Sequence, residues 1–285
     1  MSTPTIGLFL HNRTIATDPV AAAAVAELAE ELGYDSLWAG EHVVVPSPRV
    51  APSPMDPDEP ILDPVVLLAH LAARTDRIRL GTGVIVLPQR HPLVLAKQLA
   101  SLDVLCGGRL EVGIGAGYLE PELSAIGVAM DERGTRTDEY LAAMRALWED
   151  EAPAFDGTHV RFAGVDAHPR PVQRPLPVVV GGHAPVALRR AARSAEGWYG
   201  FMLSPEDTAA RVAGLREAAA GRGRDRPPHV SVTPNRRLDP ATVAAYAEAG
   251  ADRLVVALRP TADLDALRRA LDANSPAALG ARPRP

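Results

Sequence analysis

Aromatic residues and cysteine are scarce in this sequence, and the scarcity of cysteine excludes two kinds of structural support. Only 4% of the 285 residues are aromatic, and Cys106 is the single cysteine. One cysteine cannot form an intrachain disulfide, and it cannot supply the paired cysteines of a structural metal site. The fold must therefore rest on its apolar core.

Basic clusters and long apolar runs are missing as well. The formal net charge is -5 and the isoelectric point is near 5.9, which argues against a nucleic-acid partner. The most apolar N-terminal segment is interrupted by Glu27, Glu30 and Glu31, so it predicts an amphipathic helix and no membrane span. The chain opens with no signal sequence. We therefore expect a cytoplasmic protein without a membrane partner.

Short apolar runs alternate with helical patterns along the whole chain. Hydrophobic residues make up 47% of it, enough for a large core. The expected strands are 5–10, 34–39, 78–86, 110–114, 178–180, 197–202, 230–232 and 254–258, and the expected helices are 19–32, 65–74, 92–105, 135–148, 185–193, 205–219, 240–249 and 263–271.

Eight strand-helix pairs predict an α/β fold, a (β/α)8 TIM barrel, because eight parallel strands close a sheet on itself. An open doubly wound sheet is the alternative, but no break in composition divides the chain into halves. We expect one barrel domain over residues 1–273, followed by a Pro- and Ala-rich disordered tail over 274–285.

Two interruptions of the alternation are visible. Prolines follow the second strand so densely that residues 43–60 predict a long loop, neither helix nor interior strand; they stand at 46, 48, 52, 54, 57 and 60. Asp156-Gly157 lies between short apolar segments at 154–155 and 160–162. That dipeptide predicts a small hairpin inserted before the fifth strand.

Four of the predicted strands are followed by residues suited to a ligand site. His42 follows the second strand, where an imidazole could act as acid, base or hydrogen-bond donor, or could simply bond to water at the rim. Glu41 precedes it, and neighbours in an extended chain point in opposite directions, so at most one faces the centre. Gly81 and Gly83 end the third strand and indicate either a close approach of a planar ring or an ordinary strand exit.

The two remaining loops are also rich in glycine. Gly113, Gly115 and Gly117 follow a G-x-G-x-G spacing, which does not meet the dinucleotide pattern G-x-G-x-x-G. Gly181-Gly182 precedes a helix with Pro185 in its first turn, and exposed amides at a helix start attract phosphate. Each signal is weak by itself, but in a barrel all would share one rim.

A metallohydrolase is the competing interpretation of a barrel with histidines at its rim. Such enzymes need several His and Asp ligands together. His11 is followed by Asn12 and Arg13, with no second histidine nearby. G-x-S-x-G, Walker A and H-E-x-x-H motifs are missing too. We therefore expect no metal site.

Three segments carry a resemblance to a known family: RIRLGTGVIVLPQRHPLVLAKQLASLDVLCGGRLEVGIGAGY at 77–118, ERGTRTDEYLAAMRALW at 132–148 and PVVVGGHAPVALRRAA at 177–192. With them the sequence resembles the luciferase-like monooxygenase superfamily and, within it, the oxidoreductases that use the deazaflavin coenzyme F420. The resemblance implies hydride transfer between C5 of the deazaflavin, seated in the barrel mouth, and an unidentified small organic substrate.

The same resemblance implies roles for individual residues. His42 would move or orient a proton, with Glu41 as a second candidate. The Gly83-Val84 peptide would be cis or strongly bulged behind the ring. The ribityl and phosphate parts would approach Gly115, Ala116, Gly117 and Tyr118, and the phosphate would bind at Gly181, Gly182 and His183. The loop over 43–60 would form one wall of the substrate pocket.

Two alternative functions and a second copy of the chain as a partner are also considered. The chain could be an FMN-dependent monooxygenase of the same superfamily, which uses reduced flavin and oxygen. It could also be a non-catalytic protein that binds a flavin or deazaflavin. Relatives of this kind are commonly dimers, so the resemblance implies a homodimer.

Overall fold

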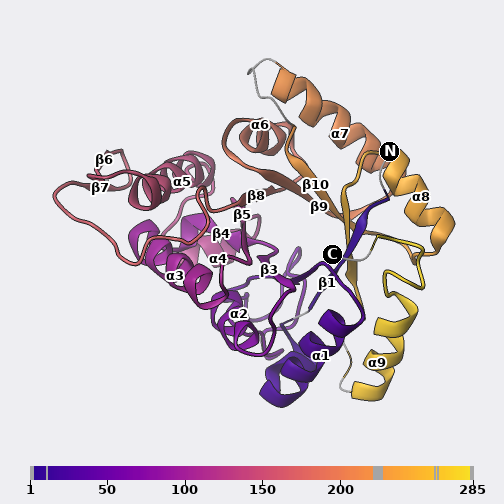
Figure 1. Ribbon diagram of the computed structural model, residues 1–285. Coiled ribbons are helices and arrows are strands. Elements are labelled where there is room, and N and C mark those ends of the chain that lie inside the picture. Colours follow the sequence, from indigo (N-terminus) through magenta and orange to yellow (C-terminus); the bar gives the residue numbers. More distant parts are fainter. Residues whose placement is uncertain (1–2, 11, 221–226, 260, 262, 283–285) are drawn as a thin grey trace.

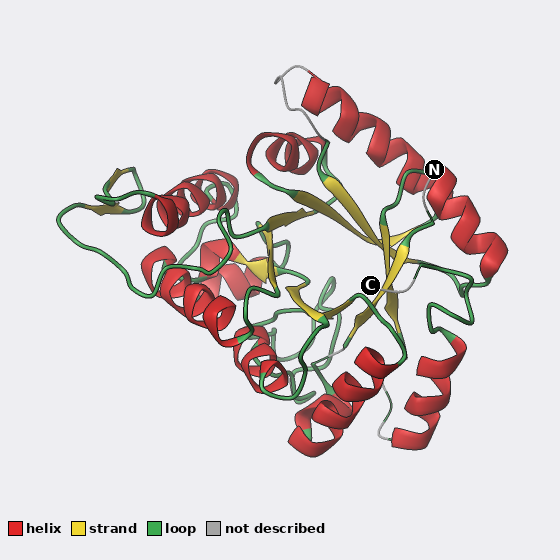
Figure 2. Cartoon of the chain, in the orientation of Figure 1, coloured by secondary structure: helices red, strands yellow, loops and turns green. Residues whose placement is uncertain are grey.

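Eight parallel strands form a closed barrel with helices around it in the computed structural model, which describes residues 3–10, 12–220, 227–259, 261 and 263–282 (Figures 1 and 2). The barrel strands are β1 (Thr5–Phe9), β2 (Ser36–Ala39), β3 (Arg79–Thr82) with its continuation β4 (Ile85–Val86), β5 (Leu110–Gly115), β8 (Val178–Gly181), β9 (Gly197–Leu203), β10 (His229–Pro234) and β11 (Arg253–Ala257). The predicted (β/α)8 fold is confirmed.

Two strand pairings complete the closed ring of barrel strands. β1 pairs in parallel with β11 from Thr5↔Arg253 to Phe9↔Ala257, which joins the first strand to the last. β3 pairs with β5 through Leu80↔Leu110, and β4 continues that contact through Ile85↔Ile114. The carboxyl ends of all eight strands therefore meet at one mouth, as the sequence predicted.

Helices cover the outside of the barrel. They are α1 (Pro19–Glu31), α2 (Pro64–Ala72), α3 (Pro92–Leu105), α4 (Glu120–Ala125), α5 (Arg133–Glu149), α6 (Pro185–Ser194), α7 (Pro205–Ala220), α8 (Pro240–Glu248) and α9 (Leu264–Ala273), with short 3-10 turns η1 (Thr14–Thr17) and η2 (Leu87–Gln89). No helix in the described ranges has the length and apolar character needed to cross a membrane.

Asp-Pro pairs define where three of these helices begin. Asp18 accepts hydrogen bonds from the N–H groups of Val20 at 2.8 Å and Ala21 at 3.2 Å, and proline occupies the first helical position. Asp63 and Asp239 cap α2 and α8 in the same way. The aspartate satisfies donors that the first turn leaves unpaired, and proline has no donor to lose there.

The predicted hairpin is present and lies beside α5, outside the barrel (Figure 1). It consists of β6 (Phe155–Asp156) and β7 (Arg161–Phe162), which pair antiparallel. The carboxylate of Glu139 in α5 accepts hydrogen bonds from three successive N–H groups of its turn, at 2.9, 2.6 and 2.7 Å. The insertion is thus fastened to a helix and does not reach the mouth of the barrel.

The C-terminal segment was predicted to be disordered, but most of it is ordered. Residues 274–282 are ordered against the barrel: Leu279 is 3% exposed within the core, and Thr5 forms a β-bridge with Arg282. Burial of Leu279 outweighs the loop-like composition that predicted disorder. Residues 283–285 lie outside the described part.

The amino-terminal end of the barrel interior contains charged side chains. The guanidinium of Arg253 in β11 donates to both carboxylate oxygens of Glu111 at 2.8 and 2.9 Å and to Asp35 at 2.5 Å. It also lies 5.5 Å from the centre of the Trp38 ring. All three charged residues are buried, so each charge is compensated within the barrel.

Helices α2 and α3 leave apolar side chains on the outer surface. Val66 is 68% exposed and Val94 is 58% exposed. The predicted homodimer stays a prediction, and these exposed side chains offer one surface for it.

Candidate active site

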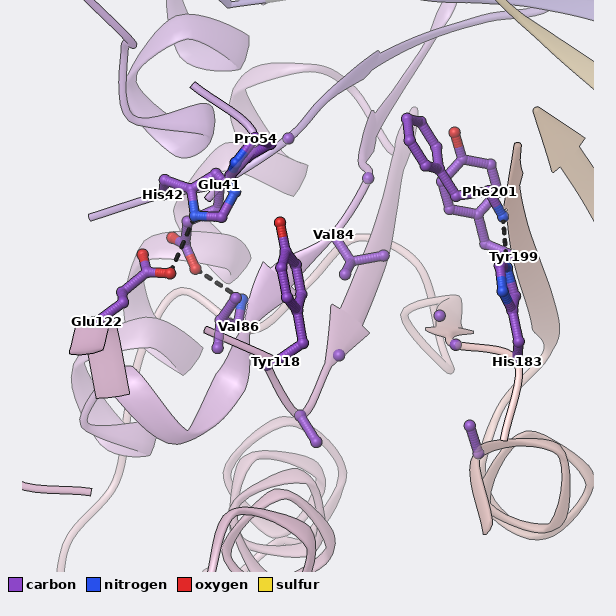
Figure 3. Close-up of a pocket in the computed structure, with 18 of the residues that line it drawn as sticks. Glu41, His42, Pro54, Val84, Val86, Tyr118, Glu122, His183, Tyr199 and Phe201 are labelled. Atoms are coloured by element: carbon purple, nitrogen blue, oxygen red, sulfur yellow. Dashed lines mark hydrogen bonds and ion pairs between the residues drawn. The ribbon is translucent and has the colours of Figure 1, made fainter. Parts of the chain in front are cut away.

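A cavity of about 530 Å³ opens at the carboxyl ends of the strands. Its walls come from the segments that follow β1, β2, β3, β5 and β8, from the starts of α4, α5 and α6, and from Tyr199 and Phe201 within β9. The structure brings together in this lining all the site residues expected from the sequence: Glu41, His42, Gly83, Val84, Gly115, Ala116, Gly117, Tyr118, Gly181, Gly182 and His183 (Figure 3). The contacts of each residue indicate what it does there.

Val84 marks the break between β3 and β4. The Gly83-Val84 peptide is cis, as predicted. A Cβ atom on Gly115 would lie 2.8 Å from one Val84 methyl, and a Cβ on Gly181 would lie 2.9 Å from the other. Both distances are too short for a side chain. Glycine is therefore required at the ends of these two strands, β5 and β8, because Val84 fills the space beside them.

Glu41 faces away from its neighbour and is almost fully buried. Its carboxylate accepts a hydrogen bond from the Val86 N–H at 2.6 Å and forms an ion pair with Arg90, including an Nε contact at 2.7 Å. Arg90 also pairs with Asp63, the cap of α2. Burial raises the pKa of Glu41, and the Arg90 guanidinium opposes that rise. These contacts tie the end of β2 to β4, directly behind Val84.

His42 turns toward α4 and meets a carboxylate there. Its Nδ1 lies 2.9 Å from Glu122 Oε2, and the other oxygen of Glu122 accepts from the Val43 N–H at 2.7 Å. Since the carboxylate accepts, Nδ1 carries the proton. In the described part of the chain Nε2 has no hydrogen-bond partner. The ring of Tyr118 stands edge-on to the imidazole, with 6.0 Å between ring centres.

The sequence patterns do not single out Glu122. It is 2% exposed, an unusual burial for a carboxylate, and it sits in the first turn of α4. One signal was available: Glu120-Pro121-Glu122 opens a helix directly after the glycine loop of β5. The pairing with His42 depends on the barrel, which brings together residues 80 positions apart.

Another part of the cavity lining contains cations and the start of α6. Helix α6 has no side-chain cap, and Ala184, Val186 and Ala187 of its start line the cavity. Arg133 also lines it and donates to the backbone carbonyls of Gly117, at 3.2 Å, and Met130. Among the described residues no carboxylate lies within ion-pair distance of Arg133. This side therefore has donors and an uncompensated positive charge.

His183 is held by the next strand. Its Nε2 accepts a hydrogen bond from the Phe201 N–H at 3.1 Å, which leaves Nδ1 as the protonated nitrogen. Burial and the nearby Arg211 lower the pKa of His183. It lies on the other side of Val84 from His42 (Figure 3). The ring is thus neutral near pH 7, and any anion held here must bind through N–H donors and Arg133.

The proline-rich loop forms the remaining wall, as predicted. Pro54, Met55 and Ile61 line the cavity, and the Met55 side chain is 2% exposed. Asn12 anchors the loop, because its side chain donates to Gly40 O at 2.9 Å and to Leu62 O. In the described ranges, no three or more His, Cys, Asp or Glu side chains gather as a metal site would require.

Comparison with known proteins agrees with this geometry. The family model for luciferase-like monooxygenases matches residues 5–278. An uncharacterised protein of Mycobacterium tuberculosis is 38% identical over 242 residues, which cover 81% of this chain and 84% of that protein.

Two solved structures share the fold at low identity. An F420-dependent secondary alcohol dehydrogenase in complex with an F420-acetone adduct has a TM-score of 0.79 at 17% identity, over 98% of this chain and 99% of that one. The oxygenating constituent of 3,6-diketocamphane monooxygenase from Pseudomonas putida, in complex with FMN, has a TM-score of 0.74 at 18% identity, over 98% of both chains.

A closed parallel barrel whose polar and glycine-rich loops surround one cavity at the strand ends has the arrangement of a barrel enzyme's active site. The chain belongs to the luciferase-like monooxygenase family, a family of oxidoreductases.

Proposed function

We propose that this protein is an F420-dependent oxidoreductase that transfers a hydride between C5 of the deazaflavin and a small organic substrate. The observation that carries the proposal is the His42–Glu122 pair, which lines the same cavity as Val84 and the glycine loops. A hydride transfer to or from a carbon that bears oxygen needs a group that exchanges a proton with that oxygen. His42 Nε2 is suited to that task.

The residues of the cavity fit a cofactor that has a flat ring and a phosphate. Val84 and the glycines beside it offer a surface without projecting polar atoms. The uncapped start of α6 and the uncompensated charge of Arg133 offer what a phosphate requires. When bound, the cofactor supplies the hydride chemistry, and the protein supplies position and proton exchange.

Each polar contact behind the cavity has a task in this scheme. Glu122 holds the proton of Nδ1, so Nε2 presents its lone pair toward the cavity. Glu41 and Arg90 hold Val86 and with it the shape of the β3–β4 break, so we assign Glu41 a positioning task. The proline-rich wall with Met55 excludes water from the reacting atoms.

An FMN-dependent monooxygenase is the second candidate. The family model is described as luciferase-like monooxygenase, and the diketocamphane monooxygenase structure contains FMN. The same donors would serve the phosphate of either cofactor.

Titration of the purified protein with F420 and with FMN, by fluorescence, separates the two. We expect micromolar binding of F420, with at least tenfold weaker binding of FMN. Binding of FMN alone would favour the monooxygenase. The third hypothesis, a non-catalytic carrier, is tested by His42→Ala: if the cofactor binds and every assayed turnover is unchanged, the carrier is correct.

Arg133 offers a direct test of the phosphate side. We expect Arg133→Ala to weaken cofactor binding by about tenfold to a hundredfold, because a charge-assisted hydrogen bond is lost (about 1.5–3 kcal/mol). Arg136→Ala is the matched control, since Arg136 lies on the same helix but pairs with Glu132 and Tyr140. Equal losses in both variants would contradict the assignment.

A further inference from the structure

We propose that the substrate is neutral and largely apolar, and that the ion pair between Arg13 and Glu59 excludes carboxylate-bearing molecules by neutralising the one cation of the substrate wall. This inference rests on the proposed function, because it takes the cavity as the place where a substrate meets a bound cofactor. It adds the chemical class of the substrate.

The substrate wall is the part of the lining on the His42 side. Pro54 and His42 lie on one side of Val84, and His183 lies on the other (Figure 3). Asn12 joins this wall to the end of β2 through its bond to Gly40 O, and Arg13 continues it through an antiparallel bridge to Ile61. Its apolar members are Pro54, Met55 and Ile61. A ligand here therefore meets mainly carbon.

Every charged side chain of this wall already has a partner within the protein. Arg13 lies 3.1 Å from Glu59, with side-chain exposures of 18% and 29%. Glu41 pairs with Arg90, and His42 faces Glu122. A charged substrate would lose its hydration here and find no free counter-charge among the residues that the structure describes, which is unfavourable.

The uncompensated cation lies elsewhere. Arg133 contacts Gly117 on the side of the glycine loops, where the cofactor phosphate is proposed to bind. Arg190, the third arginine of the lining, pairs with Asp138 at 2.8 Å. An anionic substrate therefore gains no partner there once the cofactor is bound.

The substrate wall is also held in place, so it does not reorganise easily to expose a charge. Asn12 bonds to Leu62 through both its side chain and its backbone oxygen, the latter at 2.8 Å. Within the loop, Arg49 donates to Ser53 O at 3.1 Å, and Ser53 Oγ donates to Met55 O at 2.9 Å. These bonds fix the backbone from Ser53 to Met55.

A set of three molecules of similar shape tests the charge preference. Cyclohexanone, cyclohexanecarboxylate and cyclohexylammonium are titrated by calorimetry into protein saturated with the cofactor that it binds. We expect cyclohexanone to bind at least about tenfold more tightly than either ion. Cyclohexanone binding no more tightly than the carboxylate would overturn the proposal. The readout is binding, so it does not depend on whether hydride transfer occurs.

Glu59→Gln tests the ion pair itself. Removing the carboxylate frees Arg13, so we expect cyclohexanecarboxylate to gain about tenfold or more in affinity while cyclohexanone is unchanged. Asp56→Asn is the matched control: Asp56 pairs with Arg49 in the same loop, and neither residue lines the cavity. An unchanged carboxylate affinity in Glu59→Gln, or an equal gain in Asp56→Asn, would show that the pair does not select against anions.

Discussion

Glu122 determines which nitrogen of His42 faces the cavity. An isolated imidazole exchanges its proton between Nδ1 and Nε2, and a carboxylate 2.9 Å from Nδ1 keeps the proton there. The same carboxylate holds the Val43 N–H, so it fixes the backbone that carries His42 as well as the ring. Orientation and tautomer therefore depend on one side chain.

We predict that Glu122→Ala lowers kcat by about tenfold to a hundredfold and leaves the dissociation constant of the cofactor nearly unchanged. The expected loss is smaller than that of removing His42, for which general acid–base catalysis gives about 10²–10⁴-fold. Steady-state kinetics and a cofactor titration measure both quantities. Glu122→Gln should recover part of kcat, since its amide oxygen can accept one of the two hydrogen bonds.

Glu120→Ala is the control for that variant. Glu120 is exposed in the first turn of the same helix. If both alanine variants reduce kcat equally, a general loss of α4 explains the result and Glu122 has no special task.

The break between β3 and β4 is the element that shapes the centre of the site. The family resemblance predicted a cis or strongly bulged peptide at this break, and the Gly83-Val84 peptide is cis. The reason for glycine at the ends of the two neighbouring strands was not predictable, because the contact is with the Val84 side chain and not with a ligand. A pattern of glycines indicates close approach but does not identify the group that approaches.

We predict that Gly115→Ala destabilises the protein by about 1–3 kcal/mol and weakens cofactor binding. The added methyl would lie 2.8 Å from Val84, so Val84 must shift from its place in the site. Chemical denaturation and a cofactor titration test the two effects.

Gly134→Ala provides the comparison. Gly134 lies in α5, and an added Cβ would be 3.6 Å from Arg190, an ordinary contact. Alanine in a helix is favoured over glycine by about 0.5–1 kcal/mol. A gain in stability there, beside a loss at Gly115, would confirm that Val84 and not the backbone demands glycine.

Patterns within a few residues of sequence predicted the helices and strands well. They could not predict which side chains of distant elements pair. The predicted helices over 19–32 and 65–74 start within one residue of α1 and α2, because a capping aspartate and a first-turn proline act within a few residues. The Glu41–Arg90 and His42–Glu122 pairs join residues 49 and 80 positions apart. Such pairs form only because the barrel closes. Hydrophobic periodicity predicts the number of strands in the barrel, but it does not predict which side chains meet.

At the scale of the whole molecule, the buried ions inside the barrel tie stability to pH. Burial would raise the pKa of Glu111, but the charge and hydrogen bonds of Arg253, with Arg79, hold that pKa at about 2, below the usual 4.5. A carboxyl with a lowered pKa in the folded state contributes stability above about pH 4.5, and this contribution is lost as pH falls toward 2. The charges of the barrel interior therefore favour the folded state least in acid.

We predict that Glu111→Gln lowers the free energy of unfolding by roughly 3–5 kcal/mol at pH 7, because it leaves Arg253 buried with an incomplete set of partners. The loss should shrink as the pH falls from 4.5 toward 2, since the wild-type carboxylate is then protonated too. Urea denaturation at a series of pH values measures both.

Glu149→Gln serves as the control for this variant. Glu149 forms an exposed pair with Arg145 one helical turn away, an interaction worth only about 0.3–0.5 kcal/mol. A loss at Glu111 no larger than at Glu149 would contradict the importance of the buried network.

The tail shows why composition alone misleads at this scale. Residues 274–282 look like loop or disorder in sequence, yet Leu279 fits a position in the core and Arg282 pairs with Thr5. Whether an apolar side chain finds such a place depends on the finished barrel.

Arg253 belongs to the last strand that leaves the ribosome. Until it is synthesised, β1 and β10 have no strand between them, and Glu111 lacks its bidentate partner and keeps the more distant Arg79, at 3.6 Å. The interior charges and the ring are thus completed together, once β11 has been synthesised. A chain released before residue 253 would keep most of its helices but expose two open strand edges, which makes premature termination products targets for aggregation or proteolysis.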